Sequence, residues 1–228
     1  MIEIKEGAVF IADAHYPHHG DEFMAVLQKI ESGDLLASQL FLMGDIFDLL
    51  FGHNKYIHTI NNVVITLLNK LSRKVEIYYF EGNHDFCLAN IFPNIKVYTR
   101  EEQPIYMSMG NQKIGLSHGD KFDGGFCYDS YCLLLRNKFT LNMLKPFQKH
   151  IIDYRIKKLS EKNICHGFIN FEAKVGRIMT NYNDVNLVIE GHFHQAKQFG
   201  KYISLPSLAC QKQIAVVQNN QISYFDMV

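Results

Sequence analysis

The sequence predicts an α/β fold in which a core built on a buried sheet is interrupted by a helical insertion. Up to about residue 120, short apolar runs alternate with stretches of helical periodicity, the pattern of repeated βα units. Residues 121–183 are typical of helices and carry many Lys and Arg, and strand-like runs return afterwards. We therefore divide the 228 residues into a first core part (1–120), a helical insertion or lid (121–183) and a second core part (184–228).

The first core part is expected to contain three buried strands joined by two amphipathic helices. The strands are the apolar runs at residues 8–12, 39–43 and 75–80. The first helix has one apolar face and stops near Gly33, and the second carries an apolar stripe over residues 57–71. The apolar positions of the two helices are Phe23, Val26, Leu27 and Ile30, and Ile57, Ile60, Val64, Leu67 and Leu71.

Shorter strands are expected on both sides of the insertion. They are predicted at residues 95–98, 105–109, 113–116, 186–189, 202–205, 214–217 and 222–225. The last two are joined by Asn219-Asn220, which favours a tight hairpin turn because Asn tolerates positive φ. A helical insertion between two sheet-forming parts accounts for this order.

The charge balance excludes partners that are held by bulk charge. The chain has 23 Lys+Arg and 23 Asp+Glu, a formal net charge of zero. A protein that grips nucleic acid along its surface normally has a basic excess, so we expect no nucleic-acid partner. A polyanionic substrate must therefore be bound by a local group of residues and not by the overall charge of the chain.

The chain carries no recognisable export or membrane signal. The N-terminal residues lack the basic and apolar regions of a signal peptide, and no uncharged apolar run approaches the roughly 18 residues of a spanning helix. A soluble, cytoplasmic protein is the expectation. The five Cys are odd in number and include no CxxC pair, so we expect reduced thiols and neither a disulfide framework nor a thiolate zinc site.

Polar clusters rich in metal-ligand residues follow five of the expected strands. In an open α/β sheet, ligands gather beyond the carboxyl ends of the strands, so these clusters are expected to converge in space. They are Asp13-Ala14-His15, Gly44-Asp45-Ile46-Phe47-Asp48, Gly82-Asn83-His84-Asp85, Ser117-His118-Gly119-Asp120 and Gly191-His192-Phe193-His194.

The residue types and their spacing indicate a metal site. Asp13 and His15 are two residues apart, so in extended backbone both side chains face the same way, and His192 and His194 repeat this spacing. Any one such cluster is more often a surface loop or a helix cap. Five in order favour a site of carboxylate, imidazole and amide ligands, which suits Mn, Fe, Zn, Ni or Mg better than a soft metal.

These five clusters resemble the D-x-H, G-D-x-x-D, G-N-H-[DE], [GS]-H-G and G-H-x-H blocks of the calcineurin-like metallophosphoesterase superfamily. The resemblance implies a four-layered α/β/β/α sandwich and a hydrolase with two divalent metal ions, of which Mn²⁺ is the expected one. It also implies which residues bind the metals. One ion is assigned to Asp13, His15, Asp45 and His194, and the other to Asp45, Asn83, His118 and His192.

The same resemblance assigns the remaining residues of the blocks. His84 matches a histidine that is not a metal ligand and that stabilises the transition state or protonates the leaving oxygen. Asp85 belongs to the catalytic set, and with Asp48 it is expected to orient histidines and backbone. A water whose pKa is lowered by both metals would then attack phosphorus in line with the leaving group.

The insertion resembles the lid of the UDP-2,3-diacylglucosamine hydrolase group of lipid A biosynthesis. Those enzymes cut a nucleotide-lipid pyrophosphate at the inner membrane surface to give 2,3-diacylglucosamine 1-phosphate and UMP. The resemblance rests on the length and helical character of the insertion and on the spacing of Asp129 and Arg136. It implies a nucleotide-lipid substrate and a protein that is cytoplasmic and peripheral to the cytoplasmic face of that membrane.

The expected substrate contacts lie in the insertion. They are Asp129, Lys174 and Arg177, with Arg155 and Lys158 as further basic residues for phosphate. The apolar run around Phe122 and residues 131–135 lines either a groove for acyl chains or buried core. The chain departs from the best-known members of the group, which have Arg in place of His84 and Glu in place of Asp48.

Two other functions stay open at this point. A phosphodiesterase or phosphatase could act on soluble nucleotides or phosphoproteins, because fold and metal centre alone do not choose a substrate. The second alternative is a non-enzymatic interaction scaffold that has lost its metals. Such a scaffold would be expected to lack some metal ligands, whereas all seven expected ligands are present here. The sequence leaves the metal identity and the oligomeric state undecided.

Overall fold

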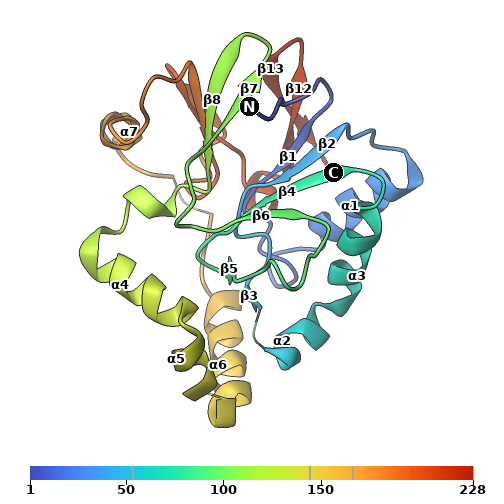
Figure 1. Ribbon diagram of the computed structural model, residues 1–228, viewed down its shortest axis with the longest axis vertical. Coiled ribbons are helices and arrows are strands. Elements are labelled where there is room, and N and C mark those ends of the chain that lie inside the picture. The colour runs from blue at the N-terminus through green and yellow to red at the C-terminus, as the bar shows by residue number, and fades with distance from the viewer. Residues whose placement is uncertain (53, 144, 166, 228) are drawn as a thin grey trace.

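Two β-sheets face each other in the computed structural model, which describes residues 1–52, 54–143, 145–165 and 167–227 (Figure 1). The first sheet has the order β13 (Gln221–Asp226), β12 (Gln213–Gln218), β1 (Val9–Ile11), β2 (Gln39–Leu42), β4 (Glu76–Phe80) and β6 (Lys96–Tyr98). The second has the order β10 (Lys197–Phe199), β11 (Tyr202–Ser204), β9 (Leu187–Glu190), β8 (Gln112–Ser117) and β7 (Ile105–Met109). Both sheets are mixed: their central strands are parallel, and antiparallel pairs lie at one edge of the first sheet and at both edges of the second.

The two sheets pack through an aromatic and aliphatic core. Successive residues of a strand point to opposite faces, so Phe10, Phe41 and Tyr78 of neighbouring strands line up on the inner face of the first sheet. Their rings stack, with centroids 4.4 Å apart for the first pair and 4.9 Å for the second. Met107, Ile114 and Ile189 of the second sheet close this core.

Helices cover both outer faces, which gives four layers and confirms the expected α/β class. On the first sheet lie α1 (Glu22–Ser32) and α3 (Asn62–Leu71), which bury the predicted apolar positions Phe23, Val26, Val64 and Leu71 among others. On the second sheet lies α7 (Phe171–Met179), whose Phe171, Val175 and Ile178 pack against Val188 and Tyr202.

The insertion splits into two parts that do different things. The helices α4 (Gly125–Arg136), α5 (Lys138–Met143) and α6 (Gln148–Ser160), with the short turns η1 (Asp120–Phe122) and η2 (Lys145–Phe147), extend away from the sheets at the bottom of Figure 1. We call α4, α5 and α6 the lid. The helix α7, which we expected in the lid, is instead an outer layer of the sandwich because its apolar face matches the second sheet.

Two local expectations differ from the structure. The single helix over residues 57–71 is broken into α2 (Lys55–Ile60) and α3, because the side chain of Asn61 donates to the carbonyl oxygens of Leu49 and Ile57. The short parallel pair β3 (Leu50–Phe51) and β5 (Asp85–Phe86) and the helix α8 (Leu208–Gln211) were not predicted.

The expectation of five reduced thiols is wrong. Cys165 and Cys210 form a disulfide across 45 residues, with their Cα atoms 5.4 Å apart. Such a pair leaves no signal in the sequence, because pairing over a long loop depends on the fold and not on Cys spacing. A membrane-crossing helix, judged by length and hydropathy, is not found among the described residues.

Candidate metal centre

The five polar clusters meet at one end of the sandwich, where the carboxyl ends of strands from both sheets come together. Clusters follow β1, β2 and β4 of the first sheet and β8 and β9 of the second. The sequence predicted convergence at a single sheet, whereas the structure achieves it with two sheets packed face to face, whose parallel strands end at the same side. Members of four of the five clusters line one cavity of about 200 Å³, namely His15, Asp45, Asn83, His84, His192 and His194.

The backbone at this end is held in an unusual conformation. Five of the seven expected metal ligands have positive φ, a region that costs a residue with a side chain roughly 1–3 kcal/mol. These are Asp13 (50°), His15 (46°), Asp45 (50°), His192 (50°) and His194 (54°). Strain of this kind persists only where the surrounding structure fixes it, and it is typical of functional sites.

Glycines let the ligand loops approach one another closely. A Cβ atom on Gly82 would lie 2.3 Å from Oδ1 of Asp45, and one on Gly44 would lie 2.4 Å from Nδ1 of His118. Gly44 also has a φ of +85°, which L side chains rarely adopt. The glycines at these two strand ends are therefore needed to bring Asp45 and His118 together.

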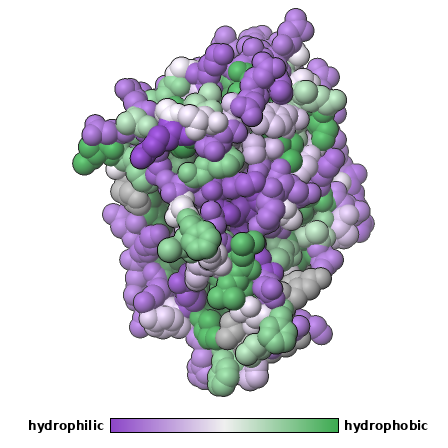
Figure 2. Space-filling model, turned by 60° about the vertical axis from the view of Figure 1, so that its left-hand side comes forward, coloured by the Kyte–Doolittle hydropathy of each residue, from purple (hydrophilic) through white to green (hydrophobic). Residues whose placement is uncertain are grey.

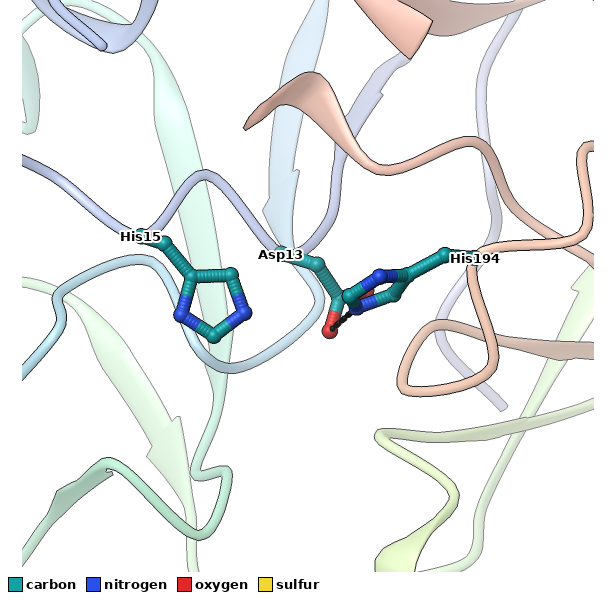
Figure 3. Close-up of side chains that lie close together, drawn as sticks. All are labelled: Asp13, His15 and His194. Carbon is teal, nitrogen blue, oxygen red and sulfur yellow. Dashed lines mark ion pairs between the residues drawn. The ribbon is translucent and has the colours of Figure 1, made fainter. Parts of the chain in front are cut away.

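The first of two ligand clusters contains Asp13, His15 and His194, whose ligand atoms lie within 4.8 Å of one another. Asp13 lies between the two imidazoles in the view of Figure 3, and its Oδ1 is 3.0 Å from Nε2 of His194. Both carboxylate oxygens of Asp13 are buried and accept no hydrogen bond. Buried acceptors of this kind normally have a partner, so the cluster is suited to a cation.

The second cluster contains Asp45, His118 and His192, also within 4.8 Å. Nε2 of His118 is 3.6 Å from Oδ2 of Asp45 and has no hydrogen-bond partner, although it is buried. Oδ1 of Asn83 is likewise buried and without a partner. Nitrogen and oxygen donors therefore point into one cavity from both clusters, as a pair of divalent cations requires.

The second ring nitrogen of three histidines is bound to backbone. Nδ1 donates to the carbonyl oxygen of Met43 in His118 (2.8 Å), of Ile164 in His194 (3.2 Å) and of Asp48 in His84 (2.8 Å). A carbonyl only accepts, so each Nδ1 carries the proton and Nε2 is the atom left for the cavity. This arrangement is typical of metal-binding histidines, whose other nitrogen is fixed by a backbone carbonyl or carboxylate.

Burial and neighbouring charges shift the pKa values of the residues in the site. Burial alone would raise the pKa of Asp45, but the neighbouring His84 and His118 hold it well below the usual range. Burial would lower the pKa of His118, and Asp45 raises it well above the usual range. Burial lowers the pKa of His15 and of His192 to about 4. These two imidazoles are neutral at pH 7, which is the form that binds metal.

Asp85 does not face the cavity but supports the loop that carries Asp45. Its fully buried carboxylate accepts hydrogen bonds from the backbone N–H groups of Asp45 (3.1 Å), Ile46 (2.6 Å) and Gly82 (2.9 Å), and from the hydroxyl of Tyr79 (2.7 Å). The structure thus places Asp85 where it positions a ligand and touches no reacting atom.

Sequence reasoning missed two histidines beside the site. His18 and His19 each place Nδ1 on the carboxylate of Asp48, at 2.9 and 2.8 Å, and Nδ1 of His15 lies 3.7 Å from it. The run of histidines after Asp13 is the signal that could have found them, because Asp48 had been expected to orient a histidine.

The three expected substrate contacts are not on the walls of the site. The guanidinium group of Arg100 donates a hydrogen bond to Oδ1 of Asp129 (2.6 Å), and Nζ of Lys174 forms an ion pair with Oδ1 of Asp123 (2.7 Å). Arg177 is exposed on α7. Asp129 and Lys174 are therefore each paired with another side chain of the protein, which the sequence could not show because neither partner belongs to the same helix.

A second, apolar cavity of about 580 Å³ opens beside the metal cavity, between the lid and the first-sheet side of the core. Its walls include Leu135, Leu141, Ile151, Ile152 and Leu159 from the lid, and Phe51 and Phe86 from the core. Asn83, His84 and Lys162 line both cavities and so mark the passage between them. Arg136, Arg155 and Lys158 add positive charge to the larger one.

Comparison with known proteins places these features in context. A family model described as Calcineurin-like phosphoesterase matches residues 8–196, which contain all five clusters. The UDP-2,3-diacylglucosamine hydrolase of Histophilus somni (strain 129Pt) is 26% identical over 200 residues, a match that covers 82% of this chain and 83% of the relative. The protein of the same name from Blochmanniella pennsylvanica (strain BPEN) is 24% identical over 217 residues, with 82% and 78% covered. A solved dimetal phosphatase from Danio rerio is 14% identical, with a TM-score of 0.49 over 98% of this chain and 96% of that chain.

Proposed function

Since this chain belongs to the calcineurin-like phosphoesterase family and is a metal-dependent phosphoester hydrolase, we propose that it hydrolyses the pyrophosphate bond of UDP-2,3-diacylglucosamine. The products would be 2,3-diacylglucosamine 1-phosphate and UMP, a step of lipid A biosynthesis. The names of the relatives support this substrate, because two of them align over four fifths of the chain. The observation that carries the proposal is the apolar cavity that joins the metal cavity.

The apolar cavity suits a substrate that has a charged end and an apolar end. Its volume of about 580 Å³ and its walls of Leu, Ile and Phe side chains can bury acyl chains, whose contact with water is unfavourable by about 0.8 kcal/mol per CH₂ group. A soluble nucleotide or a phosphoprotein side chain would leave these walls exposed. Because Asn83, His84 and Lys162 line both cavities, a lipid bound in the apolar cavity would have its phosphate-bearing end beside the metal ligands.

The residues of the metal cavity fit two divalent cations. We assign one cation to Asp13, His15, Asp45 and His194, and the other to Asp45, Asn83, His118 and His192. Such cations supply polarisation of the phosphate oxygens and a lowered pKa for the attacking water. Manganese is our choice, because the donors are nitrogen and oxygen without thiolate, with iron, zinc, nickel and magnesium as the alternatives.

His84 and Lys162 are assigned roles at the scissile bond. Nδ1 of His84 is engaged by Asp48, so its Nε2 is the atom that donates a proton to the leaving oxygen or stabilises its charge. The ammonium group of Lys162, at the passage between the cavities, would pair with a pyrophosphate oxygen. Arg155 and Lys158 extend this positive charge along the same wall.

We also propose that the lid contacts the cytoplasmic face of the inner membrane. Figure 2 shows apolar side chains in the lower part of the molecule, where the lid lies. Basic side chains on α6, such as Lys157 and Lys158, accompany them and suit anionic lipid head groups. The large apolar side chains exposed on the lid are Phe126, Tyr131, Leu133, Leu134, Phe139, Met143, Ile151 and Tyr154.

Comparison of two substrates that share the nucleotide diphosphate and the sugar tests this proposal. The Mn²⁺-loaded enzyme is assayed with UDP-2,3-diacylglucosamine and with UDP-N-acetylglucosamine, which lacks the long acyl chains. We expect kcat/KM to be at least about 100-fold higher for the lipid, the effect of roughly 3 kcal/mol of acyl burial. Equal values for the two would contradict the lipid assignment and favour the soluble-nucleotide function.

A further inference from the structure

A short segment after the lid forms part of the wall of the metal cavity. We call residues 161–165, which directly follow α6, the strap. The carbonyl oxygen of Lys162 lies 3.2 Å from Nε2 of His19, and that of Ile164 accepts the hydrogen bond from Nδ1 of His194. The side chains of Lys162 and Ile164 line the cavity. The strap therefore connects the lid to a proposed metal ligand through main-chain atoms.

The disulfide joins this strap to the core directly beside that ligand. Cys165 ends the strap, and its partner Cys210 lies on α8 with Sγ 3.9 Å from Nδ1 of His194. The helix α8 is itself tied to the ligand loops. Ser207, its N-cap, donates to the carbonyl of Asp13 (2.8 Å), and Gln211 donates to the carbonyl of His194 (2.9 Å).

We propose that the Cys165–Cys210 pair is a redox-controlled latch that sets the position of the strap on His194. It rests on the metal centre proposed above and not on the lipid substrate. With the disulfide formed, the Ile164 carbonyl stays on Nδ1 of His194 and directs Nε2 at the cavity. With the disulfide reduced, the strap loses its covalent tie to α8, and the weak hydrogen bonds at 3.2 Å no longer keep the Ile164 carbonyl on Nδ1 of His194.

The exchange needs an external dithiol, either a small molecule or a protein of the thioredoxin type. Cys165 is exposed, so a thiolate of the dithiol can attack its sulfur and displace Cys210 as a thiolate. The second thiol of the reductant then displaces Cys165, which leaves two protein thiols and an oxidised dithiol. Two electrons and two protons thus pass from the reductant to the protein, and an oxidised dithiol reverses the reaction.

The expected consequence is a change in metal affinity. Removing the partner that orients a ligating histidine typically weakens metal binding about 10- to 100-fold. Reduction should affect the cluster of Asp13, His15 and His194, to which the strap is bonded. Among the hydrogen bonds of the described residues, the strap makes none to Asp45, His118 or His192. Reduction therefore weakens one of two Mn²⁺ sites and leaves the other unchanged.

Three measurements test the latch; none needs a substrate, and the first two need no metal. Thiols are titrated in denaturant, where the oxidised protein should show three and the reduced protein five of its five Cys. Hydrogen exchange of peptides covering the strap should be faster after reduction with dithiothreitol. Mn²⁺ titration by calorimetry should show one of two sites weakened at least about 10-fold.

Matched variants separate the latch from general effects of reductant. Cys165→Ser and Cys210→Ser should behave like reduced protein in the presence or absence of dithiothreitol. Cys127→Ser, which removes an exposed thiol on α4 outside the disulfide, should behave like wild type.

Two results would overturn the latch. One is five titrating thiols after treatment with an oxidised dithiol, and the other is unchanged strap exchange and Mn²⁺ affinity on reduction. If the lipid is not hydrolysed but thiol count, exchange and affinity change as described, the proposed substrate fails and the latch stands. If no Mn²⁺ binds in either redox state, the proposed metal centre fails, and the latch with it.

Discussion

Nδ1 of His84 donates to the backbone carbonyl of Asp48 at 2.8 Å, which leaves Nε2 of the same ring 3.9 Å from Oδ2 of Asp45. The first contact fixes the ring, and the second directs its free nitrogen towards the metal cavity. His84 is thus held like the metal-binding histidines, while it stands at the passage to the apolar cavity. This geometry suits a residue that contacts the substrate and does not bind the metal.

Replacing His84 by Ala should lower kcat by about 10²- to 10⁴-fold, the usual contribution of a positioned acid or base. Metal content should stay at the wild-type value, because Asp13, His118 and the other ligands are untouched. Steady-state assay on bis(p-nitrophenyl)phosphate and metal analysis of the purified variant check this. Full activity with normal metal content would show that His84 has no role in the chemistry.

Metal removal should destabilise the protein, because the buried carboxylate oxygens of Asp13 and Oδ1 of Asn83 then accept no hydrogen bond and bind no cation. Mn²⁺ at 100 times its Kd adds about 2.7 kcal/mol per site, which raises Tm by roughly 5–10 °C for a chain of this length. His192→Asn keeps a residue that tolerates the φ of 50° but removes an imidazole ligand, so part of the rise should disappear. Differential scanning fluorimetry with EDTA or Mn²⁺ measures both. A Tm that does not respond to Mn²⁺ would refute the assigned centre.

A charge placed in the apolar cavity should lower the activity on the lipid substrate and leave the activity on a small phosphodiester unchanged. Ile151 lines this cavity and is 39% exposed, so Ile151→Glu should fold. We expect kcat/KM for UDP-2,3-diacylglucosamine to fall at least about tenfold, which corresponds to 1.4 kcal/mol, with bis(p-nitrophenyl)phosphate unaffected. The control is Phe139→Glu on α5, at 73% exposure and away from the cavity walls, assayed in detergent micelles. Equal losses in the two variants would mean that the cavity does not hold the acyl chains.

The buried Glu190 should make stability fall as pH rises. Burial raises its pKa from 4.5 to about 7, although hydrogen bonds from Tyr182 and Tyr202 oppose the shift. The folded state then holds a proton that the unfolded state has lost, so the unfolding free energy decreases between pH 4.5 and 7. Relative to wild type, Glu190→Gln should therefore gain up to about 3 kcal/mol between pH 4.5 and 8. Urea unfolding in EDTA measures the difference, and a constant difference across this range would contradict the raised pKa.

Most strands and the meeting of the five polar clusters could be predicted from the sequence, because both leave a local signal. Buried strands such as Val9–Ile11 are continuous apolar runs, and their ends are marked by Gly, Asp and His at fixed spacing. The break at Asn61 could not be predicted, since it depends on a bond to the distant carbonyl of Leu49. The disulfide likewise depends on a fold that brings residues 45 positions apart together.

The substrate contacts were the least predictable part of the site. The sequence shows that Lys174 and Asp129 are charged, but not that Asp123 and Arg100 already hold them. Lys162 has no distinguishing neighbour in the sequence, and only the fold places it between the two cavities. The packing of α7 on the second sheet, which removes Arg177 from the site, follows from tertiary contacts of Phe171 and Val175.

The most direct test of the whole account is to identify the products formed from UDP-2,3-diacylglucosamine. The Mn²⁺-loaded protein is incubated with this lipid, and the mixture is separated and analysed by mass spectrometry, with His84→Ala as the control. The account predicts equal amounts of UMP and 2,3-diacylglucosamine 1-phosphate with wild type and little of either with the variant. Intact lipid in a preparation that still hydrolyses bis(p-nitrophenyl)phosphate would contradict it.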